Sequence, residues 1–254
     1  MKTIEGLEGK VALITGSSRG IGAAIADKFS IHGADVVIHH RSGRGKGASM
    51  AKAATQRIRD RGGVAEEYIA DISVEREVDG MFSFVAKRFG KVDILVLNAA
   101  NAVFKEFKIM TTRDWDVLIN TNVMGNINCV RRALPLMCEG GNIVFISSMG
   151  SRIPMKRYPL GPMKAALESF VRLWALEFFP RKIRVNAICG GLANTDSIRA
   201  VGPLLSSSAM LHHEFLVQPE EIASVAVFLC SADAVAVTGE IITVDKGQSF
   251  ASYQ

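Results

Sequence analysis

The chain has 254 residues, of which 48% are hydrophobic and 22% charged, and this length and composition allow one large α/β domain with a sizeable core. The formal net charge of +5 at pH 7 is mild and spread along the chain, so we expect no nucleic-acid partner. The first ten residues carry charges and glycines, and no apolar stretch is long enough to cross a bilayer, so we expect a soluble, cytoplasmic protein with no membrane partner.

The first predicted unit is a buried strand that begins at Val11 and leads into a glycine-rich turn, Gly16-Ser-Ser-Arg-Gly20-Ile-Gly22. Glycine supplies the backbone freedom for a tight turn and lets N–H groups approach a pyrophosphate at the positive end of the next helix. That helix is expected over 23–32, and a second strand over 34–39. This strand-helix-strand context favours a dinucleotide site over a plain structural turn.

The segment from His39 to Ser42 ends the second strand and is expected to select the dinucleotide. Chains that select NAD usually place Asp or Glu about 20 residues after the glycines, where the carboxylate binds the ribose 2′-hydroxyl. No such residue is present here. Arg41, helped by Arg19 or by Arg44 and Lys46, is suited to pair with a 2′-phosphate, which predicts NADPH. The alternative is a solvated basic loop.

Strand and helix patterns keep alternating after this segment, which predicts a Rossmann-type, doubly wound parallel sheet of about seven strands with helices on both faces, in a single domain over 1–254. The further strands are expected over 64–70, 92–97, 142–146, 183–188 and 240–245. The further helices are expected over 48–61, 113–137 and 161–179, with one more that ends at about 89 and a last one that begins at 219. The helix over 113–137 carries four asparagines, which disfavour helices and ask for a role beyond packing. The polar segment over about 194–218 is expected to form a lid.

Two short segments follow predicted strands and are expected to touch the cofactor. Asp71 and Ile72 end the third strand, and Asp71 either hydrogen-bonds the adenine amino group or caps the next helix, which leaves both roles open. Asn98-Ala99-Ala100 ends the fourth strand, where small residues let the backbone lie against a ribose. The four cysteines are widely spaced and form neither a metal-binding pair nor a disulfide framework, so we expect reduced thiols and no metal site.

Taken together, the chain resembles the short-chain dehydrogenase/reductase family over essentially its whole length. The residues that carry the resemblance fall at the family's positions and in its order: Thr15-Gly16-x-x-x-Gly20-Ile21-Gly22, Asp71, Asn98-Ala99-Ala100, Asn122, Ser148, Lys164, Val185-Asn186-Ala187, Thr195 and Val244-Asp245. The resemblance implies a nicotinamide cofactor, hydride transfer at the carboxyl ends of the strands, and a homotetramer. The cofactor contacts expected on these grounds are Thr15, Gly16, Ser18, Arg19, Gly20, Ile21, Gly22, Arg41, Ser42, Asp71, Ile72, Asn98, Ala99, Ala100, Lys164, Gly191, Leu192 and Thr195.

The resemblance also implies four catalytic residues, Ser148, Tyr158, Lys164 and Asn122. In the family pattern Lys164 holds the nicotinamide ribose and lowers the pKa of a tyrosine. Ser148 orients the substrate carbonyl, and Asn122 anchors a water relay. A unit positive charge about 4 Å from a phenol is worth about 4 kcal/mol at an effective dielectric near 20, which brings a pKa near 10 toward the neutral range.

The tyrosine is where the chain departs from the common pattern. Most family members have Tyr four residues before the lysine, and that position here is Leu160. Tyr158 stands six residues before Lys164, and six helical steps of 100° would turn it about 120° away from the lysine's face. Pro159 biases Tyr158 toward an extended conformation, and Gly161-Pro162 favours a helix start. We therefore expect Tyr158 on a loop that turns it back into the site.

A wide spacing between tyrosine and lysine is similar to that of the enoyl-acyl-carrier-protein reductases, whose usual gap is one residue longer. One NADPH-dependent bacterial type keeps the ordinary glycine motif and shares the look of Asn98-Ala99-Ala100, of Ser147-Ser148-x-Gly150-Ser151 and of Gly190-Gly191. That resemblance implies reduction of a trans-2-enoyl thioester on acyl carrier protein or CoA. Tyr158 would then hydrogen-bond the thioester oxygen as it becomes an enolate.

Two alternatives stay open at this point. The retained Ser148 and Asn122 favour a 3-oxoacyl thioester reductase, or another ketone reductase, in which Tyr158 protonates the ketone oxygen. The displaced tyrosine also fits a weakly active cofactor-binding protein, in which Tyr158 is an ordinary surface residue.

Overall fold

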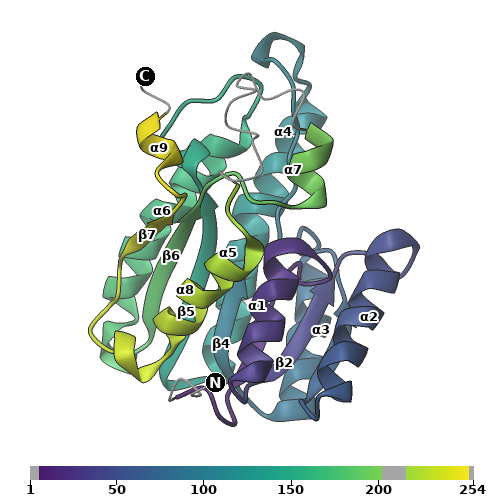
Figure 1. Cartoon of the computed structure of the whole chain (residues 1–254), viewed down its shortest axis with the longest axis vertical. Helices are drawn as coiled ribbons and strands as arrows, with labels where there is room; N and C mark the ends of the chain where they lie inside the picture. The colour runs from purple at the N-terminus through teal and green to yellow at the C-terminus, as the bar shows by residue number, and fades with distance from the viewer. Residues whose placement is uncertain (1–5, 202–215, 252–254) are drawn as a thin grey trace.

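Seven parallel strands form the central sheet of the protein, which we describe from a computed structural model over residues 6–201 and 216–251 (Figure 1). The strands are β1 (Val11–Ile14), β2 (Asp35–His40), β3 (Ala65–Ile69), β4 (Val92–Leu97), β5 (Met137–Ser148), β6 (Arg184–Gly190) and β7 (Ile241–Val244). They are ordered β3-β2-β1-β4-β5-β6-β7, and every neighbouring pair is parallel. The predicted doubly wound parallel sheet is confirmed.

Helices cover both faces of the sheet, as Figure 1 shows. The helices are α1 (Gly20–Ile31), α2 (Gly45–Asp60), α3 (Glu75–Phe89), α4 (Thr112–Ile119), α5 (Gly125–Ala133), α6 (Leu160–Glu177), α7 (Asp196–Val201), α8 (Pro219–Cys230) and α9 (Gln248–Ala251). On one face α1, α2 and α8 pack on the sheet through Phe29, Ile58 and Ile222, among others. On the other face α3, α5 and α6 do so through residues such as Val85 and Val171. The central strands are therefore covered by a helical layer on both sides, while the edge strands β3 and β7 are only partly buried.

Burial on both faces explains the sequence of the central strands. Every residue of β1 and β4 is buried, which fits runs that are apolar apart from Asp93 rather than an alternating pattern. The strand order reverses between these two neighbours, because one half of the chain builds outward from β1 to β3 and the other half from β4 to β7. Ligands of doubly wound sheets bind at such a switch point, outside the carboxyl ends of the strands.

The prediction of a single long helix over 113–137 is wrong. Between α4 and α5 the chain forms a π-helical turn, Asn120–Met124, and after α5 a short 3-10 segment, Leu134–Leu136, leads directly into β5. The Asn122 side-chain amide donates a hydrogen bond to the Leu118 carbonyl at 2.9 Å, and such competition for helix carbonyls widens a turn. Pro135 lies in the 3-10 segment and ends the helical run. Strand β5 therefore begins at Met137 instead of residue 142.

The segment predicted as a lid is described only in part. It contains α7, and a parallel bridge joins Ala193 to Val217 at its two ends. Residues 202–215 of this predicted lid lie outside the described residues. Among the helices of the described ranges, none is both long and apolar enough to cross a membrane.

Candidate active site

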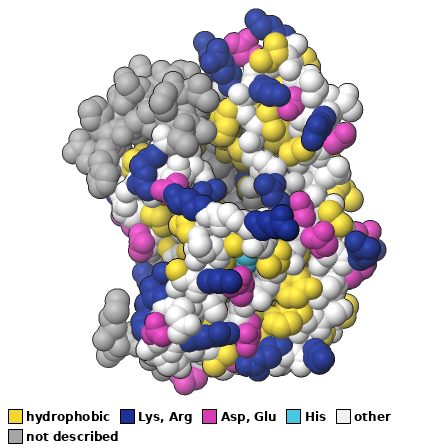
Figure 2. All heavy atoms as spheres, turned by 90° about the vertical axis from the view of Figure 1, so that its right-hand side faces the viewer, with side chains coloured by type: hydrophobic (Ala, Val, Ile, Leu, Met, Phe, Trp, Pro, Cys, Tyr) yellow, Lys and Arg dark blue, Asp and Glu magenta, His cyan; other side chains and the backbone are white. Residues whose placement is uncertain are grey.

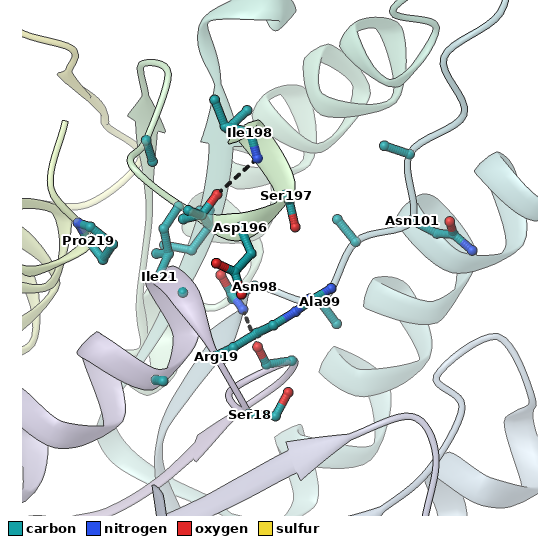
Figure 3. A pocket seen from close by; sticks show the side chains of 18 of the residues that line it. Ser18, Arg19, Ile21, Asn98, Ala99, Asn101, Asp196, Ser197, Ile198 and Pro219 are labelled. Atoms are coloured by element: carbon teal, nitrogen blue, oxygen red, sulfur yellow. Dashed lines mark hydrogen bonds between the residues drawn. The ribbon is translucent and has the colours of Figure 1, made fainter. Parts of the chain in front are cut away.

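A cavity of about 1290 Å³ opens at the carboxyl ends of the strands. Figure 3 shows Arg19 and Ile21 at the start of α1, Asn98 and Ala99 after β4, and Asp196 in α7. The predicted site residues that line the cavity are Gly16, Ser18, Arg19, Gly20, Ile21, Arg41, Ser42, Asp71, Ile72, Asn98, Ala99, Ala100, Ser148, Tyr158, Lys164, Gly191, Leu192 and Thr195. The predicted residues that do not line it are Thr15, Gly22 and Asn122.

A hydrogen-bond network around Thr15 fixes the glycine-rich turn from behind. The Thr15 hydroxyl accepts from the backbone N–H groups of Asn98 at 3.0 Å and Ala99 at 3.1 Å. The Asn98 side-chain amide donates to the Thr15 and Gly16 carbonyls, both at 2.9 Å. Gly16 has φ +66°, and a Cβ there would lie 2.9 Å from the Ala99 Cα. Only glycine meets both demands.

The start of α1 is suited to hold a phosphate group. Arg19 is the N-cap residue and makes no side-chain capping hydrogen bond. The first N–H groups of a helix have no partner within the helix, and they carry its positive end. They adjoin the large cavity beside Ser18 and Gly20, so the residues present fit a pyrophosphate at this point.

His39, which sequence reasoning did not single out for this role, is built into the same turn. It is 2% exposed, its Nδ1 accepts the Gly16 N–H at 2.9 Å, and its Nε2 lies 2.8 Å from the Ala70 carbonyl oxygen. These two backbone partners assign the proton to Nε2. Burial lowers the pKa of His39 to about 4, so the ring stays neutral at pH 7 and keeps Nδ1 as an acceptor. Its position at the end of β2 was the only signal in the sequence.

A group of basic side chains lines the cavity next to the end of β2. Arg41, Arg44 and Lys46 are exposed and line it, and Lys46 forms an ion pair of 3.3 Å with Asp196 of α7. The buried His40 ring holds the turn, because its Nδ1 lies 2.8 Å from the Ser42 carbonyl oxygen. Figure 2 shows Lys and Arg side chains across the middle of the face that carries α2 and α3, with Asp and Glu among them. This edge of the cavity suits an anionic group.

Asp71 stabilises the turn that precedes α3. Its Oδ1 accepts from the Ser73 N–H at 2.9 Å and from the Ser73 hydroxyl at 2.6 Å. The N-cap position of α3 is Val74, so Asp71 organises the turn before the helix instead of capping the helix itself. Asp71 also lines the cavity, and its contact with adenine stays a prediction.

The tyrosine loop brings Tyr158 to Ser148. As predicted, α6 begins after Tyr158, and the phenol oxygen lies 3.4 Å from the Ser148 hydroxyl oxygen. Two glycines make room for this loop. A Cβ at Gly150 would lie 2.6 Å from Tyr158 Cε1, and a Cβ at Gly161 would overlap the Gly150 carbonyl oxygen. The ring also packs against Phe104, with 5.7 Å between centroids.

The expected pairing of lysine with tyrosine takes a different form in the structure. Lys164 is 5% exposed, and its ammonium donates to the Ile146 carbonyl oxygen at 2.7 Å. Burial lowers the pKa of Lys164 to about 8, while the nearby Glu168 charge opposes that shift. Burial raises the pKa of Tyr158, and the Ser148 hydrogen bond offsets this only in part. In this structure burial therefore dominates the pKa of Tyr158, and the expectation that Lys164 lowers that pKa stays a prediction.

Asn122 lies behind the cavity wall. It is fully buried, its side-chain oxygen accepts the Asn101 N–H at 3.0 Å, and its amide donates to the Asn101 carbonyl at 2.8 Å. These bonds fix the segment after β4 that lines the cavity. They also supply a reason for asparagine in this helical region, and Asn126 adds a bond to the Asn122 carbonyl at 2.7 Å. In the described ranges no group of three or more His, Cys, Asp or Glu side chains is arranged to hold a metal ion.

Comparison with known proteins places the chain among relatives with this architecture. A family model described as Enoyl-(Acyl carrier protein) reductase matches residues 16–249. The 1-cyclohexenylcarbonyl-CoA reductase of Streptomyces collinus is 34% identical over 250 residues, which cover 94% of this chain and 87% of that protein. The 3-oxoacyl-[acyl-carrier-protein] reductase of Aquifex aeolicus is 33% identical over 251 residues, which cover 95% of this chain and 98% of that protein.

A solved structure extends this likeness to three dimensions. The angucycline C-6 ketoreductase LanV with bound NADP has a TM-score of 0.85 and 32% identity to this chain, covering 94% of this chain and 95% of that one. Fold, glycine-rich turn and whole-chain sequence similarity therefore agree. The chain belongs to the short-chain dehydrogenase/reductase superfamily of oxidoreductases, within the family that this model describes.

Proposed function

We propose that the protein uses NADPH to reduce the C2=C3 double bond of a trans-2-enoyl thioester carried by acyl carrier protein or CoA. Bound NADPH would supply the hydride. Three regions of the cavity are suited to hold it. The start of α1 would bind the pyrophosphate, Arg41 and Lys46 would bind the 2′-phosphate, and Lys164 would bind the nicotinamide ribose. The NADP bound by LanV supports this choice of dinucleotide.

The geometry around Tyr158 carries the choice of reaction: the phenol lies 3.4 Å from the Ser148 hydroxyl, while the Lys164 ammonium donates to the Ile146 carbonyl oxygen. A ketone reductase needs a tyrosine that gives up its proton to the substrate oxygen, which a pKa near neutral favours. An enoyl thioester needs a hydrogen-bond donor toward the oxygen that becomes an enolate while hydride adds to C3, and the enolate then takes up its C2 proton from solvent. Because burial raises the pKa of Tyr158, its phenol stays protonated and suits the second task. The Ser148 hydroxyl beside it orients the phenol.

The family description and the relative that acts on a cyclohexenylcarbonyl-CoA, an unsaturated thioester by its name, support the same reaction. A 3-oxoacyl thioester is the second candidate. It is favoured by the contact between Tyr158 and Ser148, which also suits a ketone oxygen, and by the relative named as a 3-oxoacyl reductase. A homotetramer belongs to the proposal as well, and light scattering of the purified protein tests it.

Initial rates of NADPH oxidation with crotonyl and acetoacetyl thioesters, measured side by side, test the proposed reaction. NADH is the control cofactor and Tyr158→Phe the control enzyme. We expect turnover of the crotonyl thioester with NADPH and its loss in Tyr158→Phe. Turnover of the acetoacetyl thioester alone would replace the proposal by the second candidate. Binding of NADPH without turnover of either thioester, and with no effect of Tyr158→Phe, would indicate a cofactor-binding protein.

A further inference from the structure

A buried carboxylate, which the reaction above does not use, lies one helical turn after Lys164. Glu168 of α6 is 7% exposed. Its Oε1 accepts hydrogen bonds from the hydroxyls of Ser147 and Ser151, both at 2.6 Å. Its Oε2 lies 3.5 Å from the Arg152 guanidinium. Both oxygens of the carboxylate therefore bind groups near the end of β5.

These partners flank the segment that carries the site. Ser147 directly precedes Ser148, and Ser151 ends the short 3-10 turn that follows it. That turn contains Gly150, which touches the Tyr158 ring. A carboxylate that binds the chain on both sides of Ser148 restricts how this segment can move relative to α6.

The other side of the network reaches the edge of the sheet. The Arg152 guanidinium donates to the Thr243 hydroxyl at 3.1 Å and to the Ile241 carbonyl at 3.5 Å. The counter-ion of Glu168 is thus held by β7, while Glu168 itself is held by α6. The network joins these two elements to the end of β5.

Glu168 also acts on Lys164 through its charge. Residues four apart in a helix lie on the same face, and the Glu168 charge opposes the effect of burial on the lysine. The other groups that face the carboxylate are the Arg152 cation and the Cys189 thiol, whose pKa burial raises to about 11, so it is neutral. Glu168 is thus the negative charge that acts on the Lys164 ammonium.

We infer that Glu168 is a positioning residue of the reductase site, which holds the Ser148 segment in place and keeps its carboxylate one helical turn from Lys164. This inference rests on the proposed function for the roles of Ser148 and Lys164. Burying a carboxylate is costly, and a well-packed apolar side chain often serves stability equally well. A purely structural Glu168 would leave the ionisation of Lys164 and the kinetics of the site unchanged once its shape is kept.

The test compares Glu168→Gln, which keeps the shape and an acceptor oxygen but removes the charge, with Glu177→Gln on the exposed end of the same helix. Lysine labelled with 13C at Cε is titrated by NMR, and the Lys164 signal is assigned by its absence in Lys164→Arg. We expect the Lys164 midpoint to move to lower pH in Glu168→Gln and to stay unchanged in Glu177→Gln. The alkaline limb of the kcat profile moves in the same direction, and kcat falls by about tenfold to a hundredfold while the KM for NADPH changes less.

An unchanged Lys164 midpoint together with an unchanged kcat in folded Glu168→Gln would overturn the inference. If that variant does not fold, Ser151→Ala removes one of the bonds to the carboxylate at a partly exposed position, and a kcat equal to that of the wild type would overturn the positioning role. The lysine titration needs no substrate. A shifted midpoint in a protein that reduces neither thioester would therefore reject the proposed function and leave the inference about Glu168 standing.

Discussion

Adding one methyl group at Gly150 tests whether the position of Tyr158 sets the rate. A Cβ at residue 150 would lie 2.6 Å from Tyr158 Cε1 and 2.8 Å from Cδ1. Carbon atoms in contact normally keep about 3.5–4.0 Å, so the ring must retreat by roughly 1 Å. The phenol already lies 3.4 Å from the Ser148 hydroxyl, and the retreat carries it away from its place in the site. A displacement of that size costs up to about a hundredfold in rate.

We expect Gly150→Ala to lower kcat by about tenfold to a hundredfold, to leave the dissociation constant of NADPH within about twofold, and to cost about 1–3 kcal/mol of unfolding free energy. The control is the same substitution in a Tyr158→Phe background. If Gly150 acts through the phenol, the double variant is no slower than Tyr158→Phe alone. Independent, additive losses of kcat in the two variants would refute the reasoning.

The remaining predictions concern Tyr158, the basic end of the cavity and the glycine-rich turn. Tyr158→Phe lowers kcat by about a hundredfold to a thousandfold, because it removes a donor to the developing oxyanion, while fluorescence titration shows NADPH binding unchanged. Arg41→Leu weakens NADPH binding by about tenfold or more and leaves NADH binding unchanged, and equal effects on both would place Arg41 away from the 2′-phosphate. His39 has a pKa of about 4 in the folded chain against an ordinary 6.5, so the unfolded chain takes up this proton first as pH falls. The stability that His39 contributes is therefore complete above about pH 6.5 and is lost toward pH 4, by about 3 kcal/mol. Guanidinium unfolding of wild type and His39→Asn across this range checks it, and parallel pH profiles would contradict it.

The parts of the fold that follow local rules could be predicted from the sequence. Apolar strands alternate with helical spacing, and the glycine-rich turn lies between the first strand and helix, so the parallel sheet and the cavity wall at Gly16 were expected. The helix start after Tyr158 was also predictable, since Pro159 and Gly161-Pro162 act on their immediate neighbours.

Features that depend on contacts between distant segments were not predictable in this way. The π-helical turn arises because Asn122 binds both Leu118 and the backbone of Asn101, and the second partner lies 21 positions away. The acceptor role of His39 depends on a turn that lies 23 positions earlier. The raised pKa of Tyr158 reflects burial by packed neighbours such as Phe104. Residue spacing predicts a charge beside a phenol and says nothing of its desolvation.

The measurement that tests the central claim most directly is the fate of the hydride. NADPH carrying deuterium at nicotinamide C4 is incubated with the purified protein and a crotonyl thioester, and the position of the deuterium in the product is determined by mass spectrometry and NMR. Deuterium at C3 of a butyryl thioester is the predicted result, since hydride adds to the β-carbon while Tyr158 binds the thioester oxygen. The acetoacetyl thioester is incubated in a parallel reaction. A crotonyl thioester that stays unreduced, together with deuterium at C3 of a 3-hydroxybutyryl product in the parallel reaction, would contradict the claim.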